Sequence, residues 1–326
     1  MKKFFAALLC ALALSLCACG EIPDAVESPV VELPVIGISQ VGAESDWRHA
    51  NTESMKSVFT EENGYRILFE DARQKQENQI LAMRKFIHQQ VDYIVLMPIG
   101  EYGWEPVLQD AREAGIPVIL VDRMVNVDDE SLYTAHVGSD FYRQGEMATE
   151  WMAERYAPEE EVKILHILGT PESTAQIGRT QALENAVQQH ENWQIIAQLD
   201  GDFTQAKAYS VVSRYLDENP GVEIDLVYCE NDNEAYGAIE ALEERGYVCG
   251  EDVEIISFDA TRRCLQLCLE GKIALAVECN PLLGPPAEEI IRMLENGEIP
   301  EKQLYVPERC FTKDDLSEEF IASREY

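Results

Sequence analysis

The fold is decided by the stretch Val35-Ile-Gly-Ile-Ser-Gln-Val-Gly-Ala-Glu-Ser-Asp-Trp-Arg48. This stretch begins as a short apolar run typical of a buried strand, continues into a polar turn and then opens a helix. The turn carries five polar or aromatic residues at the carboxyl end of the strand, namely Glu44, Ser45, Asp46, Trp47 and Arg48. Because ligands bind at this edge of open α/β sheets, the sequence predicts a binding site here.

The same strand–helix unit recurs along the chain. Short apolar runs predict strands at residues 35–39, 65–70, 93–97, 117–121, 163–168, 194–199, 226–229, 254–258 and 274–277. Amphipathic segments predict helices at 47–62, 77–90, 105–114, 141–156, 176–189, 204–218, 233–245, 262–269 and 287–295. The strands are apolar throughout rather than alternating, as parallel strands covered on both faces are. Nine such strands exceed one compact sheet of this type, so we expect an α/β fold with two lobes, each a parallel doubly wound sheet flanked by helices.

The first 18 residues have the features of a secretory signal peptide. Two lysines precede an apolar run too short to span a bilayer, and small residues follow it. The run ends in Leu-Cys-Ala-Cys19, which resembles a bacterial lipobox with Cys19 as the acylated residue; Cys17 would put a leucine where a small residue is needed. The alternative is a plain cleaved signal peptide. Residues 19–34 lack periodicity and contain several prolines, which predicts a tether between membrane and folded body.

Charge and cysteine content limit the partners. The formal net charge is −34, and a surface this acidic repels phosphate backbones, which argues against nucleic-acid binding. The five histidines are scattered and no CxxC pair occurs after the signal peptide, so no metal site is predicted. An even number of cysteines permits up to three disulfides in an exported protein, although buried thiols are favoured. The six cysteines after residue 19 are Cys229, Cys249, Cys264, Cys268, Cys279 and Cys310.

Three further strand ends carry polar side chains. The strand before Asp122-Arg123, the strand before Glu230-Asn231-Asp232 and the strand before Asp259 all finish in this way. Carboxylates, guanidinium groups and amides can each engage two neighbouring hydroxyl groups, and an aromatic side chain such as Trp47 can cover the apolar face of a sugar ring. The four strand ends together therefore predict a pocket for a monosaccharide.

Each of these residues also has a structural alternative. Asp122 and Arg123 could form a local surface ion pair, and Asp259 could cap the following helix. Capping suits Asp232 better than Asn231, so Asn231 is assigned to the ligand and Asp232 to the structure. Trp47 alone could be an ordinary core residue.

Sequence signatures of catalysis and of cofactor binding are missing from the chain. It has no GxGxxG after a strand, no phosphate-binding loop and no Gly-x-Ser-x-Gly elbow. We expect neither enzymatic activity nor a cofactor. A glycosidase remains the enzymatic alternative, because sequence does not separate a catalytic carboxylate pair from the other acidic residues.

Several longer runs carry a family resemblance. They are Ser39–Arg48, Gln74–Ile80, Gly103–Leu108 and Gly201–Thr204, extended by Asn231-Asp232, Asn280-Pro281 and Gly284-Pro285. The chain resembles type I periplasmic sugar-binding proteins, the substrate-binding components of ABC importers, and most of all their galactofuranose-binding members. The resemblance spans nearly everything from Val35 to about Phe311.

This resemblance implies a two-lobed fold hinged at three crossing segments. Residues 35–139 and 281–305 would form the N-terminal lobe, and residues 140–280 and 306–326 the C-terminal lobe. It also implies ligand contacts, and it adds Arg179, on the start of a helix, to those predicted from the strand ends. The implied contacts are Glu44, Ser45, Asp46, Trp47, Arg48, Asp122, Arg123, Arg179, Asn231 and Asp259. Two positions depart from the family: Asp46 stands where a small residue is common, and Cys279 where many sugar binders carry glutamine.

The function implied by the resemblance is capture of a monosaccharide, galactofuranose or a related sugar, and its delivery to an ABC permease with its ATPase. We expect a monomer outside the cytoplasm, anchored to the membrane through lipid on Cys19, and such an anchor suggests a Gram-positive cell. One alternative is a sugar-sensing protein that presents its bound state to a membrane receptor kinase. A transcriptional repressor of the same fold is disfavoured by the signal peptide, the charge and the missing helix-turn-helix head.

Overall fold

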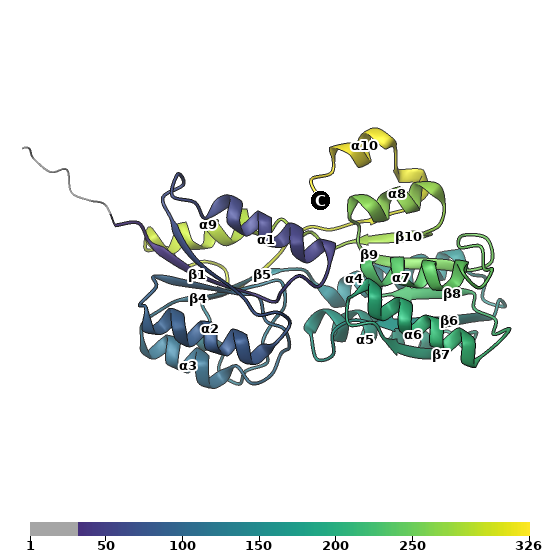
Figure 1. Cartoon of the computed structure of the whole chain (residues 1–326), viewed down its shortest axis with the longest axis horizontal. Coiled ribbons are helices and arrows are strands. Elements are labelled where there is room, and N and C mark those ends of the chain that lie inside the picture. The colour runs from purple at the N-terminus through teal and green to yellow at the C-terminus, as the bar shows by residue number, and fades with distance from the viewer. Residues whose placement is uncertain (1–31) are drawn as a thin grey trace, which may run out of the picture. The chain divides into compact units, whose positions relative to one another are not determined.

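Residues 32–326 are described by a computed structural model (Figure 1). The predicted signal peptide, Cys19 and most of the predicted tether lie outside the described residues. Within 32–326, no helix is long and apolar enough to cross a membrane.

The first sheet has six strands in the order β11-β5-β4-β3-β1-β2, and every pair in it is parallel. The strands are β1 (Val35–Gln40), β2 (Arg66–Asp71), β3 (Tyr93–Leu96), β4 (Val118–Val121), β5 (Ala135–Gly138) and β11 (Gln303–Tyr305). One face is covered by α1 (Asp46–Val58) and α9 (Gly284–Glu295), the other by α2 (Gln76–His88) and α3 (Glu105–Glu113) (Figure 1). We call this sheet with its helices the first lobe.

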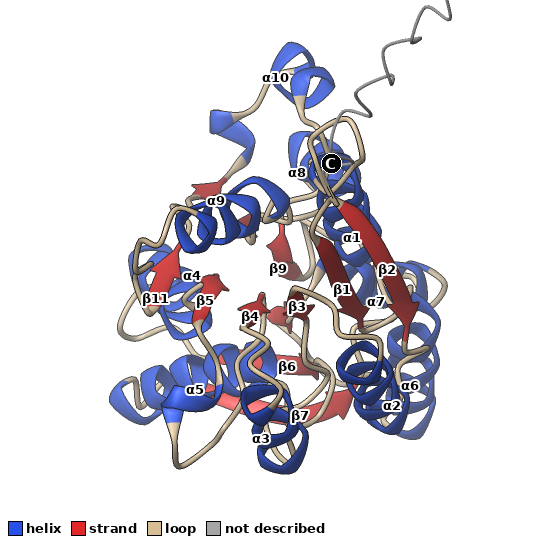
Figure 2. Ribbon diagram, turned by 90° about the vertical axis from the view of Figure 1, so that its left-hand side faces the viewer, coloured by secondary structure: helices blue, strands red, loops and turns tan. Residues whose placement is uncertain are grey.

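The second sheet also has six strands, in the order β12-β10-β9-β8-β6-β7, and only β12 runs antiparallel to its neighbour. The strands are β6 (Val162–Leu168), β7 (Trp193–Asp200), β8 (Leu226–Cys229), β9 (Glu254–Asp259), β10 (Leu275–Glu278) and β12 (Cys310–Phe311). The helices of this second lobe are α4 (Phe141–Arg155), α5 (Thr174–Gln189), α6 (Gln205–Glu218), α7 (Asp232–Glu243), α8 (Arg262–Glu270) and α10 (Glu318–Ser323). Both sheets are enclosed between helices (Figure 2).

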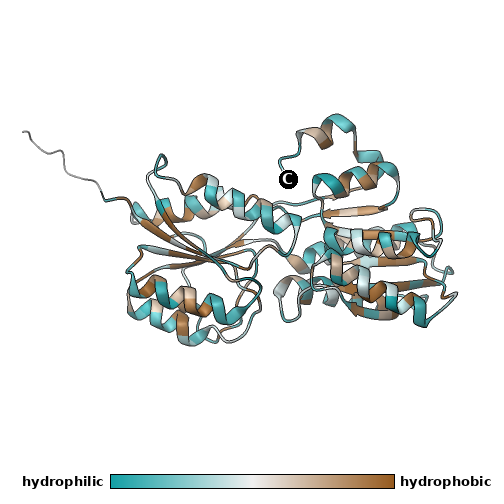
Figure 3. Cartoon of the chain, in the orientation of Figure 1, coloured by the Kyte–Doolittle hydropathy of each residue, from teal (hydrophilic) through white to brown (hydrophobic). Residues whose placement is uncertain are grey.

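Buried apolar strands hold each lobe together. β3, β4, β8 and β10 consist almost entirely of fully buried residues, and the strands are the most hydrophobic elements of both lobes (Figure 3). Polar side chains cap the helices that follow strands: Ser45 accepts the backbone N–H of Arg48, and Asp140 accepts that of Arg143. The capped helix starts therefore lie at the carboxyl edges of the strands, where the site is formed.

The chain crosses between the two lobes three times. The first crossing joins β5 to α4 around Ser139, the second joins β10 to α9 around Asn280, and the third joins β11 to β12 around Glu308. These three places are called the crossing segments below.

The predicted fold class is confirmed, and all nine predicted strands and nine predicted helices are present. The described residues also contain β5, β11, β12 and α10, which were not predicted. β11 and β12 have three and two residues, too short to show a hydrophobic period. β5 was missed because the polar residue His136 interrupts its four-residue apolar run.

Candidate functional site

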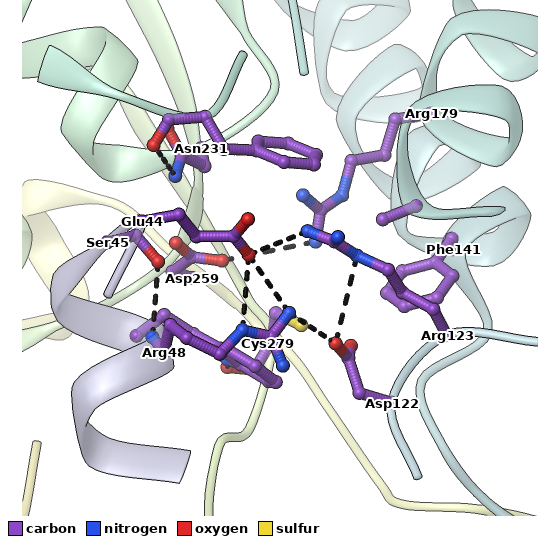
Figure 4. Close-up of a pocket in the computed structure, with 13 residues that line it drawn as sticks. Glu44, Ser45, Arg48, Asp122, Arg123, Phe141, Arg179, Asn231, Asp259 and Cys279 are labelled. Carbon is purple, nitrogen blue, oxygen red and sulfur yellow. Dashed lines mark hydrogen bonds and ion pairs between the residues drawn. The ribbon is translucent and has the colours of Figure 1, made fainter. Parts of the chain in front are cut away.

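A pocket with an empty volume of about 270 Å³ is formed by loops and helix starts from both lobes (Figure 4). Nine of the ten predicted site residues line it. The lining residues are Glu44, Ser45, Trp47, Arg48, Asp122, Arg123, Phe141, Ala175, Arg179, Phe203, Asn231, Asp259 and Cys279. The structure thus brings the four predicted strand ends together at one pocket, while contact of these side chains with a ligand stays a prediction.

A buried ion-pair network forms the first-lobe wall. Glu44 Oε1 accepts hydrogen bonds from Arg48 Nη2 at 3.0 Å and from Arg123 Nη2 at 2.8 Å. Asp122 Oδ2 accepts a second bond from Arg48 Nη2 at 2.6 Å. All four residues are less than 10 % exposed, so Asp122 and Arg123 are not the surface ion pair of the structural alternative. Removing one partner of such a buried network would leave an unpaired buried charge.

Two guanidinium nitrogens in this wall make no hydrogen bond among the described residues, although Arg123 Nε lies 3.9 Å from Asp122 Oδ2. Arg48 Nη1 and Arg123 Nε are buried and make no hydrogen bond within residues 32–326. Burial by itself lowers the pKa of both arginines; the charges of Asp122 and Glu44 outweigh that effect at Arg48, whose pKa is raised, but not at Arg123. Both side chains stay charged, because arginine does not deprotonate in proteins. Buried charged donors without a hydrogen bond are uncommon and costly, so these two are suited to bind acceptor oxygens of a ligand.

Asp122 and Asp259 share an unusual backbone conformation at the two strand ends that they occupy. Asp122 follows β4 with φ 68°, and Asp259 ends β9 with φ 110°. Aspartate and asparagine tolerate positive φ better than other residues with a side chain, and such backbone strain is concentrated at functional sites. The strain sets each carboxylate at the edge of its sheet, facing the pocket.

Arg179 forms the charged part of the second-lobe wall. Its Nε and Nη2 both donate to Gln144 Oε1, at 3.0 and 2.8 Å, and its Nη1 donates to the carbonyl of Glu230. Asp259 Oδ1 lies 4.0 Å from Arg179 Nη2. The guanidinium is therefore held from one side by an amide and from another by a backbone carbonyl, while it faces the pocket.

Close packing of α4 on α5 brings two lining residues together. A Cβ on Gly145 would lie 2.5 Å from Ala182 Cβ, and a Cβ on Gly178 would lie 2.8 Å from Phe141 Cβ. Only glycine permits this approach of the two helices at these positions. Phe141 on α4 and Arg179 on α5 thereby share one wall, with the guanidinium carbon 5.4 Å from the ring centroid.

The other two aromatic rings are paired with guanidinium groups in the same way. Arg48 lies 4.7 Å from the Trp47 ring, and Arg123 lies 5.2 Å from the Phe203 ring. Cation–π contact of this kind stabilises desolvated pairs by about 1–2 kcal/mol. Trp47 is fixed further by donation from its Nε1 to the carbonyl of Cys279 at 2.7 Å. The pocket therefore offers aromatic surfaces in fixed orientations.

The sequence assigned the helix cap at α7 to the wrong residue. Asn231, not Asp232, is the N-cap: its Oδ1 accepts the backbone N–H of Glu234 at 2.8 Å in a full capping box. Its Nδ2 donates to the carbonyl of Phe203 at 3.1 Å. Asp232 is buried and accepts hydrogen bonds from Ser257 and Thr261. Asn231 thus lines the pocket and holds Phe203 there at the same time.

Asp46 is the one predicted site residue that does not line the pocket. Its side chain is exposed, and its backbone N–H donates to Asn233 Oδ1 at 3.0 Å. The predicted helix began at Trp47, which put Asp46 in the turn, whereas α1 begins at Asp46 with Ser45 as its cap. The first helical residue points away from the strand edge, so the charge of Asp46 lies outside the pocket.

Phe141, Ala175 and Phe203 were not predicted as site residues. Phe203 follows β7 in the run Gly201–Thr204, so it is another strand-end position that the same logic could have found. Phe141 begins the helix after β5, the strand that was missed. Ala175 has no polar or aromatic side chain that would have marked it as a site residue in the sequence. Cys279, which the sequence marked only as a departure from the family, lines the pocket as well.

All six cysteines in residues 32–326 are free thiols, the favoured interpretation of the sequence. Five of them are buried, and burial raises the pKa of Cys279 well above its usual range. Within the same residues, no cluster of three His, Cys, Asp or Glu side chains could hold a metal ion. The chemistry of the pocket is that of hydrogen bonding, charge and aromatic surface.

The ionisation of Asp259 leads to a prediction about pH. Burial, followed by the charge of Asp232, raises the pKa of Asp259 well above its usual value. The folded state therefore binds more protons than the unfolded state above about pH 4, and this group's contribution to stability falls as pH rises. Asparagine has no such dependence. We expect the melting temperature of Asp259→Asn, minus that of the wild type, to increase as pH is raised from about 5 to about 8. Calorimetry without ligand measures both melting temperatures. A difference that does not change with pH would contradict the prediction.

Comparison with known proteins gives a consistent result. The family model described as "Periplasmic binding protein domain" matches residues 36–283. The galactofuranose-binding protein of Escherichia coli is 34 % identical over 301 residues, which are 91 % of this chain and 94 % of that protein.

Two solved structures extend the comparison. The periplasmic binding protein of the arabinose ABC transporter from Shewanella sp. ANA-3, bound to α- and β-L-arabinofuranose, is 35 % identical with a TM-score of 0.82, covering 86 % of this chain and 92 % of that one. A protein from Mycobacterium smegmatis in complex with β-D-fucofuranose is 39 % identical with a TM-score of 0.83 and the same coverage. With the family model spanning most of its length and a full-length relative above 30 % identity, the chain belongs to the periplasmic binding protein family.

Proposed function

We propose that this protein binds one uncharged monosaccharide, in its furanose form, in the pocket between Trp47, Asp122, Arg179 and Asn231. The observation that carries the proposal is a pair of buried guanidinium nitrogens without a hydrogen bond in the described part of the chain, Arg48 Nη1 and Arg123 Nε, in a pocket with three aromatic rings. Sugar hydroxyls would accept from these donors and donate to the carboxylates. The role is binding rather than catalysis.

The charges of the pocket favour a neutral ligand. Glu44 and Asp122 are ion-paired with Arg48 and Arg123 in the pocket wall. An anionic sugar would have to disturb these ion pairs, and desolvation of its own charge would add to the cost.

The relatives support the furanose form. The three compared proteins are described as binding galactofuranose, arabinofuranose and fucofuranose. Each is at least 34 % identical to this chain over most of its length. A five-membered ring with an exocyclic chain is the feature that these three sugars share, and it is the ligand class that we assign to this pocket.

The test is a thermal-shift screen followed by NMR. L-Arabinose and D-galactose should raise the melting temperature by mass action, and D-galacturonate, which carries a charge, should not. Sugars labelled with ¹³C at the anomeric carbon then report which ring form is bound. If no pentose or hexose raises the melting temperature, monosaccharide binding is wrong; a bound pyranose signal would refute only the ring form.

Delivery to an ABC permease is the second part of the proposal. The relative from Shewanella is described as a component of an arabinose ABC transporter, which supports import over sensing. Uptake of labelled sugar into proteoliposomes that contain the permease and ATPase encoded with this protein should require it. If uptake is unaffected but the loaded protein stimulates a membrane receptor kinase, the sensing alternative is correct.

The anchor is proposed from the sequence alone, on Cys19 and the lipobox-like run before it. A diacylated cysteine provides the two chains that stable membrane attachment needs, and it would hold the monomeric protein outside the cytoplasm of a Gram-positive cell. Palmitate labelling of the expressed protein should be lost in Cys19→Ala and retained in Cys17→Ala. Labelling that persists in Cys19→Ala would refute the assignment.

A further inference from the structure

One carboxylate connects all three crossing segments. Glu308, in the third segment, uses its Oε1 to accept a hydrogen bond from Ser139 Oγ at 2.6 Å and another from the backbone N–H of Asn280 at 2.8 Å. Ser139 belongs to the first crossing segment and Asn280 to the second. The position of this carboxylate is therefore fixed by every segment that joins the two lobes.

The other oxygen of Glu308 points toward the pocket wall through Gln144. Glu308 Oε2 accepts from Gln144 Nε2 at 2.6 Å, and the same amide nitrogen donates to the carbonyl of Glu278 at 3.2 Å. Gln144 is fully buried on α4, and its Oε1 accepts both Nε and Nη2 of Arg179. A continuous hydrogen-bonded chain thus runs from the crossing segments through Gln144 to the guanidinium in the pocket.

The groups at its two ends fix the direction in which hydrogen bonds are donated along this hydrogen-bonded chain. An ionised carboxylate only accepts hydrogen bonds and a guanidinium only donates them, so the amide between them has one acceptable orientation. A flipped Gln144 would turn its NH₂ group toward the N–H groups of Arg179 and its oxygen toward Glu308. Both contacts would then be repulsive, and buried donors left without acceptors are costly.

We propose that Glu308 is a positioning residue, which orients Arg179 through Gln144 and thereby sets the affinity of the pocket for its sugar. The inference rests on the proposed function, because it takes Arg179 to contact the sugar. Without the oriented amide, Arg179 keeps only the carbonyl of Glu230 and is free to turn toward the carboxylate of Asp259, which lies 4.0 Å away. A cation paired with Asp259 no longer presents its donors to a ligand, and it also occupies a carboxylate that a hydroxyl would use.

A swap of the two side chains tests the proposal. In Glu308→Gln two amides face each other, so one N–H donor must face another donor somewhere in the series of hydrogen bonds from Ser139 and Asn280 to Arg179. In Gln144→Glu two carboxylates face each other at the short distance now spanned by a hydrogen bond. The double variant E308Q/Q144E restores the direction. The new amide at position 308 can accept from Ser139 and Asn280 and donate to the new carboxylate at position 144, which still accepts from Arg179. The one bond that is not restored is the donation to the carbonyl of Glu278.

Affinities are measured by calorimetry with L-arabinose and D-galactose. Each single variant should bind roughly 10- to 100-fold more weakly than the wild type. The double variant should bind several-fold more tightly than Gln144→Glu, a non-additivity typical of residues in one network. Glu288→Gln is the matched control: Glu288 is a buried glutamate on α9 that bonds to Arg292 and does not line the pocket. Its affinity should equal that of the wild type.

The outcomes separate this inference from the proposed function. A wild type that binds no pentose or hexose overturns both. If the wild type binds sugar, two results overturn the positioning role alone. One is that E308Q binds as tightly as the wild type, and the other is that the double variant binds no more tightly than Q144E. If E308Q does not fold, the comparison of Q144E with the double variant decides the same question, since only a restored hydrogen-bond direction predicts that the second substitution improves binding.

Discussion

Replacing Asp122 with asparagine is expected to weaken sugar binding by roughly 30-fold or more. The carboxylate accepts a 2.6 Å hydrogen bond from Arg48 in a fully buried network, and loss of one charge from such a pair at a binding site costs about 2 kcal/mol or more. Asparagine keeps the shape of the side chain and tolerates the positive φ of this position. Calorimetric titration with L-arabinose and D-galactose measures the effect.

The choice of asparagine over alanine matters for interpretation. Alanine at φ 68° would add backbone strain of about 1 kcal/mol or more, and a folding defect would then mix with the binding defect. Asp202→Asn is the matched control, since Asp202 has a similar φ of 54° but lies outside the pocket. Its affinity should be that of the wild type. An Asp122→Asn protein that binds normally would remove Asp122 from the site.

Replacing Asn231 with alanine is expected to reduce both stability and binding. Loss of the N-cap of α7 costs about 1 kcal/mol, and the carbonyl of Phe203 left without its buried donor costs about 1–3 kcal/mol more. We therefore expect the free energy of unfolding to fall by about 2–4 kcal/mol in urea titrations without ligand. Binding should weaken as well, because Phe203 is released from the pocket wall.

The variant Asn231→Asp separates the two roles of this side chain. Aspartate is a good N-cap acceptor, but it cannot donate to the carbonyl of Phe203. Its carboxylate would also face that carbonyl oxygen in a buried site, so its unfolding free energy should fall below that of the wild type although the cap is kept. If Asn231→Ala unfolds at the same urea concentration as the wild type, with the same slope, the cap and the bond to Phe203 contribute nothing measurable.

Most of the site could be predicted because strand ends in a parallel sheet converge. Glu44, Asp122, Asn231 and Asp259 each follow a buried apolar run, and such runs are visible without any structure. Arg179 is different: it lies on the second turn of α5, away from any strand end, and only the family resemblance suggested it. Its place in the pocket depends on how closely α4 and α5 pack, which sequence does not specify directly.

The differences between prediction and structure are single-residue shifts at helix starts. α1 begins one residue earlier than predicted, and this turns Asp46 away from the pocket. α7 begins with Asn231 rather than Asp232 as its cap, so the residue assigned to the ligand also has a structural task. Helix boundaries are uncertain by a residue or two in any prediction from sequence, and at a strand–helix junction that is enough to reverse the direction of a side chain.

The positive φ angles at the two carboxylate positions restrict how this binding protein can change its ligand. Residues 122 and 259 accept asparagine or glycine with little strain, but a longer or branched side chain at either position would have to overcome the backbone as well as the pocket. Substitutions that change the sugar specificity are therefore expected at lining residues whose φ angles are not positive. Cys279 and Ala175 are the natural starting points: both are small, and a larger polar side chain at either could reshape the recognised hydroxyl pattern without touching the charged network.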